Sequence, residues 1–112
     1  MQEPSPAWRV VARKQELLQS GLREIQIGRR IVLLVGYGDQ VFAFQGTCPH
    51  QSARLAQGSL IEGTIQCPHH LARFRLDDGA CTGGWQLPPL KRFAVRVHGD
   101  DILLSDPLML LE

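Results

Sequence analysis

Residues 48–70 read CPHQSARLAQGSLIEGTIQCPHH and contain two short segments rich in cysteine and histidine, sixteen residues apart. The first segment is Cys-Pro-His at residues 48–50, and the second is Cys-Pro-His-His at residues 67–70. Thiolates and imidazoles are suitable ligands for iron or zinc. Because the whole chain has only three cysteines and four histidines, this concentration predicts a metal site that the two segments build together.

The composition and setting of the segments favour an iron–sulfur cluster. A [2Fe–2S] cluster with two thiolates on one iron and two imidazoles on the other needs the sulfur and nitrogen ligands that these segments offer. Pro49 and Pro68 follow the cysteines, and a fixed φ suits a rigid loop better than a helix. Between the segments, Gly58, Gly63 and the alternation at 64–66 predict loop, turn and strand, whereas a zinc finger places a helix there. A zinc site that only stiffens two loops remains the alternative.

The motif resembles that of the Rieske family, which is Cys-x-His, about 15 to 17 residues, and then Cys-x-x-His. The resemblance implies that Cys48 and Cys67 bind one iron of a [2Fe–2S] cluster and that His50 and His70 bind the other, with one cluster per chain. His69 is the alternative to His70, because a Cys67-x-His69 arrangement is also sterically conceivable. The family spacing favours His70.

Length and composition predict one small domain. The 112 residues, 44% of them apolar, suffice for one modest core, and the net charge of +1 favours neither nucleic acid nor an anionic membrane. Two of the three cysteines belong to the metal motif, so we expect a reducing compartment. The N-terminal residues do not resemble a signal peptide, and no apolar run approaches the ~18 residues of a membrane span. We expect a soluble, cytoplasmic protein with a flexible tail at residues 1–7.

The pattern of the chain predicts an all-β fold. No helical periodicity is sustained, and short alternating stretches recur roughly every eight to twelve residues, as in a sandwich or barrel. One helical turn is expected at residues 14–22, with Gly21 as its end. The expected strands are residues 8–12, 23–27, 31–35, 41–44, 72–76, 93–97 and 102–105.

The resemblance to the Rieske family also covers the layout. It implies an antiparallel β-sandwich base with a smaller cluster-binding subdomain inserted at roughly residues 45–86, and a Gly/Pro loop at 83–89 beside the cluster. Where respiratory-type members carry two extra disulfide cysteines, this chain has Ala53 and His69. Where they place serine and tyrosine hydroxyls near the cluster sulfurs, it has Ala72 and Phe74. Fewer hydrogen bonds to the sulfurs lower the reduction potential, so we expect about −150 mV, the low end of the Rieske range.

The resemblance implies a one-electron carrier rather than an enzyme. It points to the ferredoxin component of a bacterial aromatic-ring dioxygenase or toluene-type monooxygenase, which links an NAD(P)H-dependent reductase to a terminal oxygenase. A catalytic oxygenase subunit also needs a mononuclear iron with two further histidines and a carboxylate, and only His69 and His98 are left over. Two alternatives stay open: a small Rieske-like subunit of a larger reductase, of the nitrite reductase type, and a zinc-stiffened binding module.

Three features remain without a firm assignment. Arg54 and Arg73 lie near the ligand segments in sequence and are candidates for steering an acidic partner. Cys81 is expected to be a packed hydrophobic residue rather than a redox thiol. The apolar stretch 107–111 is expected either to fold over the base or to contact a partner.

Overall fold

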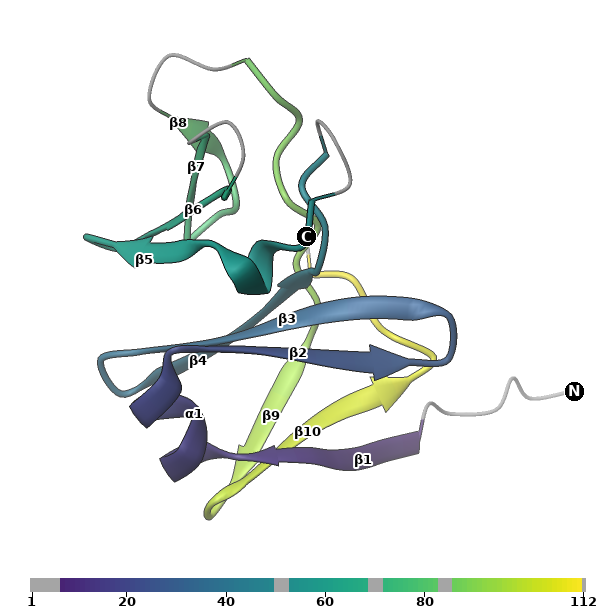
Figure 1. The fold of residues 1–112 in the computed structure, drawn as a ribbon. Coiled ribbons are helices and arrows are strands. Elements are labelled where there is room, and N and C mark those ends of the chain that lie inside the picture. The colour runs from purple at the N-terminus through teal and green to yellow at the C-terminus, as the bar shows by residue number, and fades with distance from the viewer. Residues whose placement is uncertain (1–6, 50–52, 69–71, 83–85, 112) are drawn as a thin grey trace, which may run out of the picture.

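The computed structural model describes residues 7–49, 53–68, 72–82 and 86–111. Within these ranges the strands form three antiparallel sheets, of order β1-β10-β9, β2-β3-β4 and β5-β6-β7-β8 (Figure 1). The elements are β1 (Ala7–Arg13), α1 (Lys14–Ser20), β2 (Leu22–Ile27), β3 (Arg30–Tyr37), β4 (Gln40–Gln45), the 3-10 helix η1 (Leu55–Gln57), β5 (Ser59–Ile61), β6 (Thr64–Gln66), β7 (Arg73–Arg75), β8 (Cys81–Thr82), β9 (Val95–His98) and β10 (Asp101–Asp106).

The sheet β2-β3-β4 is the middle layer of the molecule. Figure 1 shows β1, β9 and β10 on one side of it and the sheet β5–β8 on the other. We call β5–β8 the smaller sheet, because its four strands are only two or three residues long. The two larger sheets and α1 enclose the first core, and we call these elements the base. This core contains Ala12, Leu17, Val32, Leu34, Ala43, Phe93, Ile102 and Leu104.

Strand β3 is buried on both faces, which explains why residues 31–35 are continuously apolar. Side chains alternate across a strand, so Val32 and Leu34 enter the first core while Leu33 and Val35 point the other way. All four are fully buried. At about 1.5–3 kcal/mol for each buried aliphatic side chain, this strand is a main source of stability for both cores.

Leu33 and Val35 belong to a second core, which joins the middle sheet to the smaller sheet and to both cysteine-bearing segments. Because Cys48 and Cys67 lie in this core, packing of the smaller sheet and formation of the metal site are physically linked. Its buried members are Leu33, Val35, Phe44, Cys48, Ala53, Leu55, Ile65, Cys67, Ala72, Phe74, Leu76 and Leu90.

The predicted all-β class is confirmed, and the structure corrects several boundaries. Gly21 ends the helix as predicted, because it adopts a φ of 82° and donates its N–H to the Leu17 carbonyl at 2.7 Å, so that the last helical residue is Ser20 rather than residue 22. Ala7, expected in the tail, is the first residue of β1 because it pairs with Asp106; the rest of that tail lies outside the described residues. The strand expected at 93–97 begins at Val95. None of the described helices is long and apolar enough to cross a membrane.

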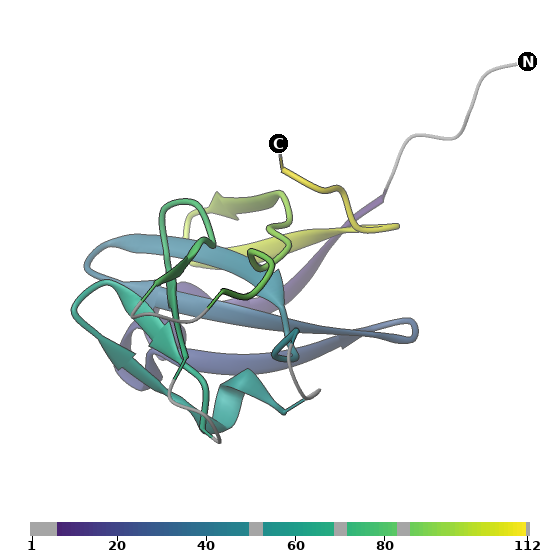
Figure 2. The same cartoon turned by 90° about the horizontal axis from the view of Figure 1, so that it is seen from above.

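The C-terminal segment turns back from β10 and lies along residues 92–94 (Figure 2). Ala94 donates its N–H to the Met109 carbonyl at 2.7 Å, and Leu111 donates to the Arg92 carbonyl at 2.8 Å. The segment therefore folds over the base, one of the two expected outcomes. The side chains of Met109, Leu110 and Leu111 nevertheless stay 44%, 58% and 48% exposed.

Candidate metal centre

The first cysteine opens a hairpin tip that extends from β4. Thr47 and Arg54 form an isolated antiparallel bridge, and between them Cys48 donates its backbone N–H to the Ala53 carbonyl at 2.8 Å. We call residues 48–53 the first ligand loop. Its exit is fixed by Leu55, which donates its N–H to the Gly46 carbonyl at 3.0 Å.

The second cysteine opens a tip of the same construction between β6 and β7. Gln66 pairs with Arg73, and between them Cys67 donates its N–H to the Ala72 carbonyl at 2.7 Å. We call residues 67–72 the second ligand loop. Each loop therefore spans the same number of residues and holds its cysteine at the same place, immediately inside the last antiparallel pair.

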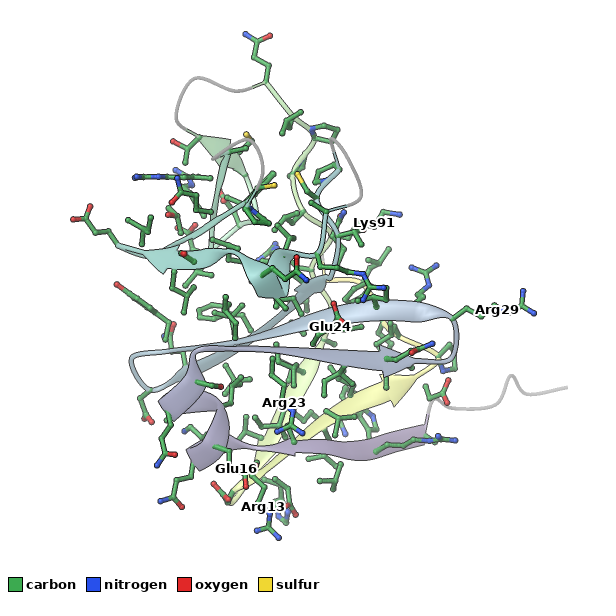
Figure 3. The ribbon with its side chains drawn as sticks, viewed as in Figure 1. Arg13, Glu16, Arg23, Glu24, Arg29 and Lys91 are labelled. Atoms are coloured by element: carbon green, nitrogen blue, oxygen red, sulfur yellow. The ribbon has the colours of Figure 1, made fainter. Side chains whose placement is uncertain are left out.

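Both thiols are withdrawn from solvent, with Cys48 2% and Cys67 0% exposed, and both are packed in the second core. Figure 3 shows sulfur atoms gathered at the end of the molecule that carries the smaller sheet. A buried thiol pair beside two histidine-bearing segments supplies the two-thiolate half of the donor set that a [2Fe–2S] cluster needs. The described residues thus fit that cofactor.

The predicted histidine ligands lie outside the described residues. His50, His69 and His70 are among the positions that the structure does not describe, so the choice between His69 and His70 stays a prediction. Within the described ranges, no three His, Cys, Asp or Glu side chains are grouped so as to hold a metal ion.

Gly58 lets the two ligand loops approach each other. A Cβ atom at this position would overlap the carbonyl oxygen of Gln66, the residue directly before Cys67. Gly58 also donates its N–H to the Leu55 carbonyl at 2.9 Å, which ends η1 just after the first ligand loop. The sequence indicates only a turn here, whereas the structure shows that the side chain has to be absent.

Gln45 is a supporting residue that the sequence did not reveal. Its side-chain oxygen accepts the N–H of Lys91 at 2.8 Å, and its side-chain nitrogen donates to the Thr47 carbonyl at 2.8 Å. Its own backbone N–H donates to the Lys91 carbonyl at 2.9 Å. Because Thr47 precedes Cys48, Gln45 ties the chain around Lys91 to the entrance of the first ligand loop. A lone glutamine at the end of an apolar strand gives no signal of this role.

The side chains expected to lower the potential are buried near the cysteines. Ala72 and Phe74 are fully buried in the second core and carry no hydroxyl. Cys81 is partly buried against the same core, and its Sγ lies 3.8 Å from the Thr82 carbonyl oxygen. This packing agrees with the expectation of a small hydrophobic residue.

An ion pair lies on the protein surface near each ligand loop. Arg75 hydrogen-bonds the Asp78 carboxylate, which also accepts the Ala80 N–H at 2.9 Å, and these contacts lower the pKa of Asp78 to about 2. The same pairing raises the pKa of Arg75. Directly after the first ligand loop, Arg54 forms an ion pair with Glu24 at 2.7 Å, so its charge is partly countered. The expectation that Arg54 and Arg73 steer an acidic partner stays a prediction.

Two hairpin loops, each beginning with a buried cysteine and closed by the same backbone hydrogen bond, define a class of small β protein with a loop-held metal centre. The family model described as Rieske [2Fe-2S] domain matches residues 7–94, and the chain belongs to this family. Membership confirms the predicted family and the [2Fe–2S] cofactor and sets the zinc alternative aside.

Relatives of known role narrow the class. The chain is 29% identical over 90 residues to the ferredoxin component of biphenyl 2,3-dioxygenase from Rhodococcus jostii, covering 80% of this chain and 84% of the relative. It is 34% identical over 88 residues to the ferredoxin component of the alkene monooxygenase system of Xanthobacter autotrophicus, covering 73% and 68%. Both relatives are electron-transfer components rather than oxygenases, which confirms the predicted class.

A solved structure matches almost the whole fold. It is the complex of reduced oxygenase and oxidised ferredoxin of carbazole 1,9a-dioxygenase, matched with a TM-score of 0.79 and 26% identity over 88% of this chain and 92% of the matched chain.

Proposed function

We propose that this chain is the ferredoxin component of a bacterial oxygenase system, which takes single electrons from an NAD(P)H-dependent reductase and delivers them to a terminal oxygenase. The main support for the proposal is that the sequence similarity to the ferredoxin component of biphenyl 2,3-dioxygenase extends over 84% of that protein, and so over nearly the whole of an electron carrier. The match to a ferredoxin solved together with its oxygenase supports the acceptor. We infer the reductase from the proposed role, since an electron carrier needs a protein that supplies its electrons. We also propose a cytoplasmic location.

In this proposal Cys48, Cys67, His50 and His70 hold the cluster, which supplies one-electron oxidation and reduction when bound. The chain itself holds the cysteine ligands rigidly and shields them from water. Buried thiols, tips closed by backbone hydrogen bonds and a proline after each cysteine limit movement of the ligands. Small movement favours rapid electron exchange with a docked protein, and neither a substrate pocket nor a bond-making side chain is required.

The proposal includes a low reduction potential, of about −150 mV. Alanine at position 72 and phenylalanine at position 74 provide no hydroxyl to hydrogen-bond a cluster sulfur, so the reduced, more negative cluster is less stabilised. Protein-film voltammetry measures this directly. A potential well above zero would show that other donors, which these two positions do not provide, stabilise the reduced state.

The decisive experiment is anaerobic purification followed by metal analysis, visible absorption and EPR of the dithionite-reduced protein. We expect two iron and two sulfide per chain, a red-brown colour and reversible one-electron reduction. Zinc, or no metal at all, would overturn the proposed electron carrier.

A further inference from the structure

We propose that a cationic face on the flank of the first ligand loop docks an acidic surface of a protein redox partner. The face consists of Arg29, Arg30 and Lys91, with Thr47 at one edge and the apolar Leu110 at the other. The inference rests on the proposed function, since docking matters only if the chain exchanges electrons with another protein.

The cations of this face have no carboxylate partner among the described residues. The same holds for Arg73, for Arg92, which donates to the Asp77 carbonyl, and for Arg96, which lies over the Trp8 ring. Arg29, Arg30 and Lys91 are exposed, and among the described residues none has a carboxylate oxygen within 4.0 Å. Six other cations each have such a partner: Arg9 with Asp106, Arg13 with Asp100, Lys14 with Asp39, Arg23 with Glu16, Arg54 with Glu24, and Arg75 with Asp77 and Asp78.

The face is continuous and lies next to the metal site. Arg30, Thr47 and Lys91 line one shallow groove, and Thr47 is the residue directly before Cys48. Arg29 and Arg30 line the adjoining hollow, and Lys91 also lines the next one together with Leu110. Figure 3 places Lys91 beside the upper loops and Arg13 at the opposite end of the molecule.

The architecture holds the face in position relative to the cysteine. The backbone of Lys91 is bound twice to Gln45, whose side chain also binds the Thr47 carbonyl at 2.8 Å. Two carboxylates line the hollows of this face, Asp106 beside Arg29 and Arg30 and Asp78 beside Lys91. Each already has a cationic partner, because Asp106 pairs with Arg9 at 3.4 Å and Asp78 pairs with Arg75. A partner docked on the face would therefore meet a net positive surface whose spacing from the first ligand loop is fixed.

An acidic protein surface suits the face better than other anionic partners. The exposed side chains of Leu110 and Leu111, at 58% and 48%, extend the face with apolar area of the kind that protein interfaces bury. Nucleic acid and anionic membranes select larger basic surfaces, whereas this chain has a net charge of only +1. Local charges of this kind act over about 8 Å at physiological salt and accelerate association more than they tighten the complex.

The test compares electron transfer from the dithionite-reduced protein to two protein acceptors, the acidic plastocyanin and the basic cytochrome c, by stopped-flow absorbance. The variant R30E/K91E reverses two charges on the face. The matched control R13E/R23E also reverses two arginine charges, but away from the face: Figure 3 shows Arg13 at the opposite end of the molecule and Arg23 on the middle sheet. Each of these arginines takes part in an exposed ion pair.

For the wild type we expect faster oxidation by plastocyanin at low salt than at high salt. R30E/K91E should slow this reaction about tenfold at low salt and accelerate oxidation by cytochrome c, whereas the control should change either rate less than about twofold. Amide chemical shifts on titration with redox-inactive, zinc-substituted plastocyanin provide a second readout, with changes at residues 29–30 and 91 but not at 13 and 23.

Wild-type preference for cytochrome c, rates independent of salt, or equal slowing by both variants would each overturn the docking face. In those cases a normal cluster spectrum and complete reduction by dithionite would leave the proposed function standing. Failure of the wild type to become reduced would instead refute the electron carrier itself.

Discussion

The first ligand loop grows out of β4 of the base, whereas the second joins β6 and β7 of the smaller sheet. Where they begin and end, the loops are closed in the same way, because Cys48 and Cys67 donate to the carbonyls of Ala53 and Ala72 at 2.8 and 2.7 Å. Their supports differ. The first loop is tied to distant segments by Gln45 and by an exposed Arg54–Glu24 pair. The second loop is held by its own hairpin and by the apolar core. The two loops thus share the same closing hydrogen bond but differ in the tertiary contacts that support them.

The largest expected effect concerns the cysteines. Cys48→Ser and Cys67→Ser should each abolish the cluster, because both thiolates bind the same iron in the proposed site. Iron and sulfide content with visible absorption measures the loss, and far-UV circular dichroism should show that the base remains folded. If one variant kept a stable cluster, the two loops would not contribute equivalent ligands.

The histidines test whether the two loops also place their second metal ligand at the same position. His69 follows Cys67 at the same interval as His50 follows Cys48, yet the family motif favours His70. We expect His70→Ala to lose the Rieske absorption and EPR spectra and His69→Ala to retain them. The reverse outcome would mean that the loops match at the histidine as well, and that the proposed ligand is wrong.

The alanines that accept the two tip hydrogen bonds test the difference in packing. Ala72 is fully buried, whereas Ala53 is 8% exposed. Ala72→Val should lower the free energy of unfolding by about 1–3 kcal/mol through overpacking, and Ala53→Val should lower it by less. Urea unfolding of the cluster-loaded protein measures both. Equal losses would indicate that the loops are packed alike.

The smallest effect concerns Asp78, beyond the second ligand loop. Its folded-state pKa, about 2, lies below the ordinary value of 3.8, so its contribution to stability is complete above the ordinary value and lost as the pH falls through about 2. Asp78→Asn should therefore reduce stability near neutral pH, and its difference from the wild type should shrink on acidification between these values. Asp101→Asn, at the start of β10, is the control. Thermal unfolding against pH measures both; a difference that grows on acidification would contradict the assigned pairing.

Several features of the fold and of the metal site could be predicted from the pattern of neighbouring residues in the sequence. The apolar run at 31–35 indicated a buried strand, and the alternation at 23–27 a half-buried one, because burial of one or both faces leaves a direct imprint on the sequence. The Cys-Pro-His motifs indicated the cofactor because ligand chemistry is a property of the residues themselves. Gly21 was expected to end the helix and does so, because glycine readily adopts the positive φ of a helix cap. The boundary at Ala7 was missed, since its pairing with Asp106 depends on a backbone contact that composition does not record.

The sequence by itself determined the all-β class and predicted the candidate donors and their spacing, because each is set by the chemistry or conformational preference of neighbouring residues. Only the tertiary structure decided that β3 would serve two cores, that Gln45 would bind the entrance of the first loop, and that Glu24 would counter Arg54 from thirty residues away. The same folding left Arg30 and Lys91, sixty-one residues apart in the chain, as neighbours with no carboxylate partner among the residues that the structure describes. Such features depend on which distant segments meet, and side-chain contacts of that kind are fixed only when the sheets pack.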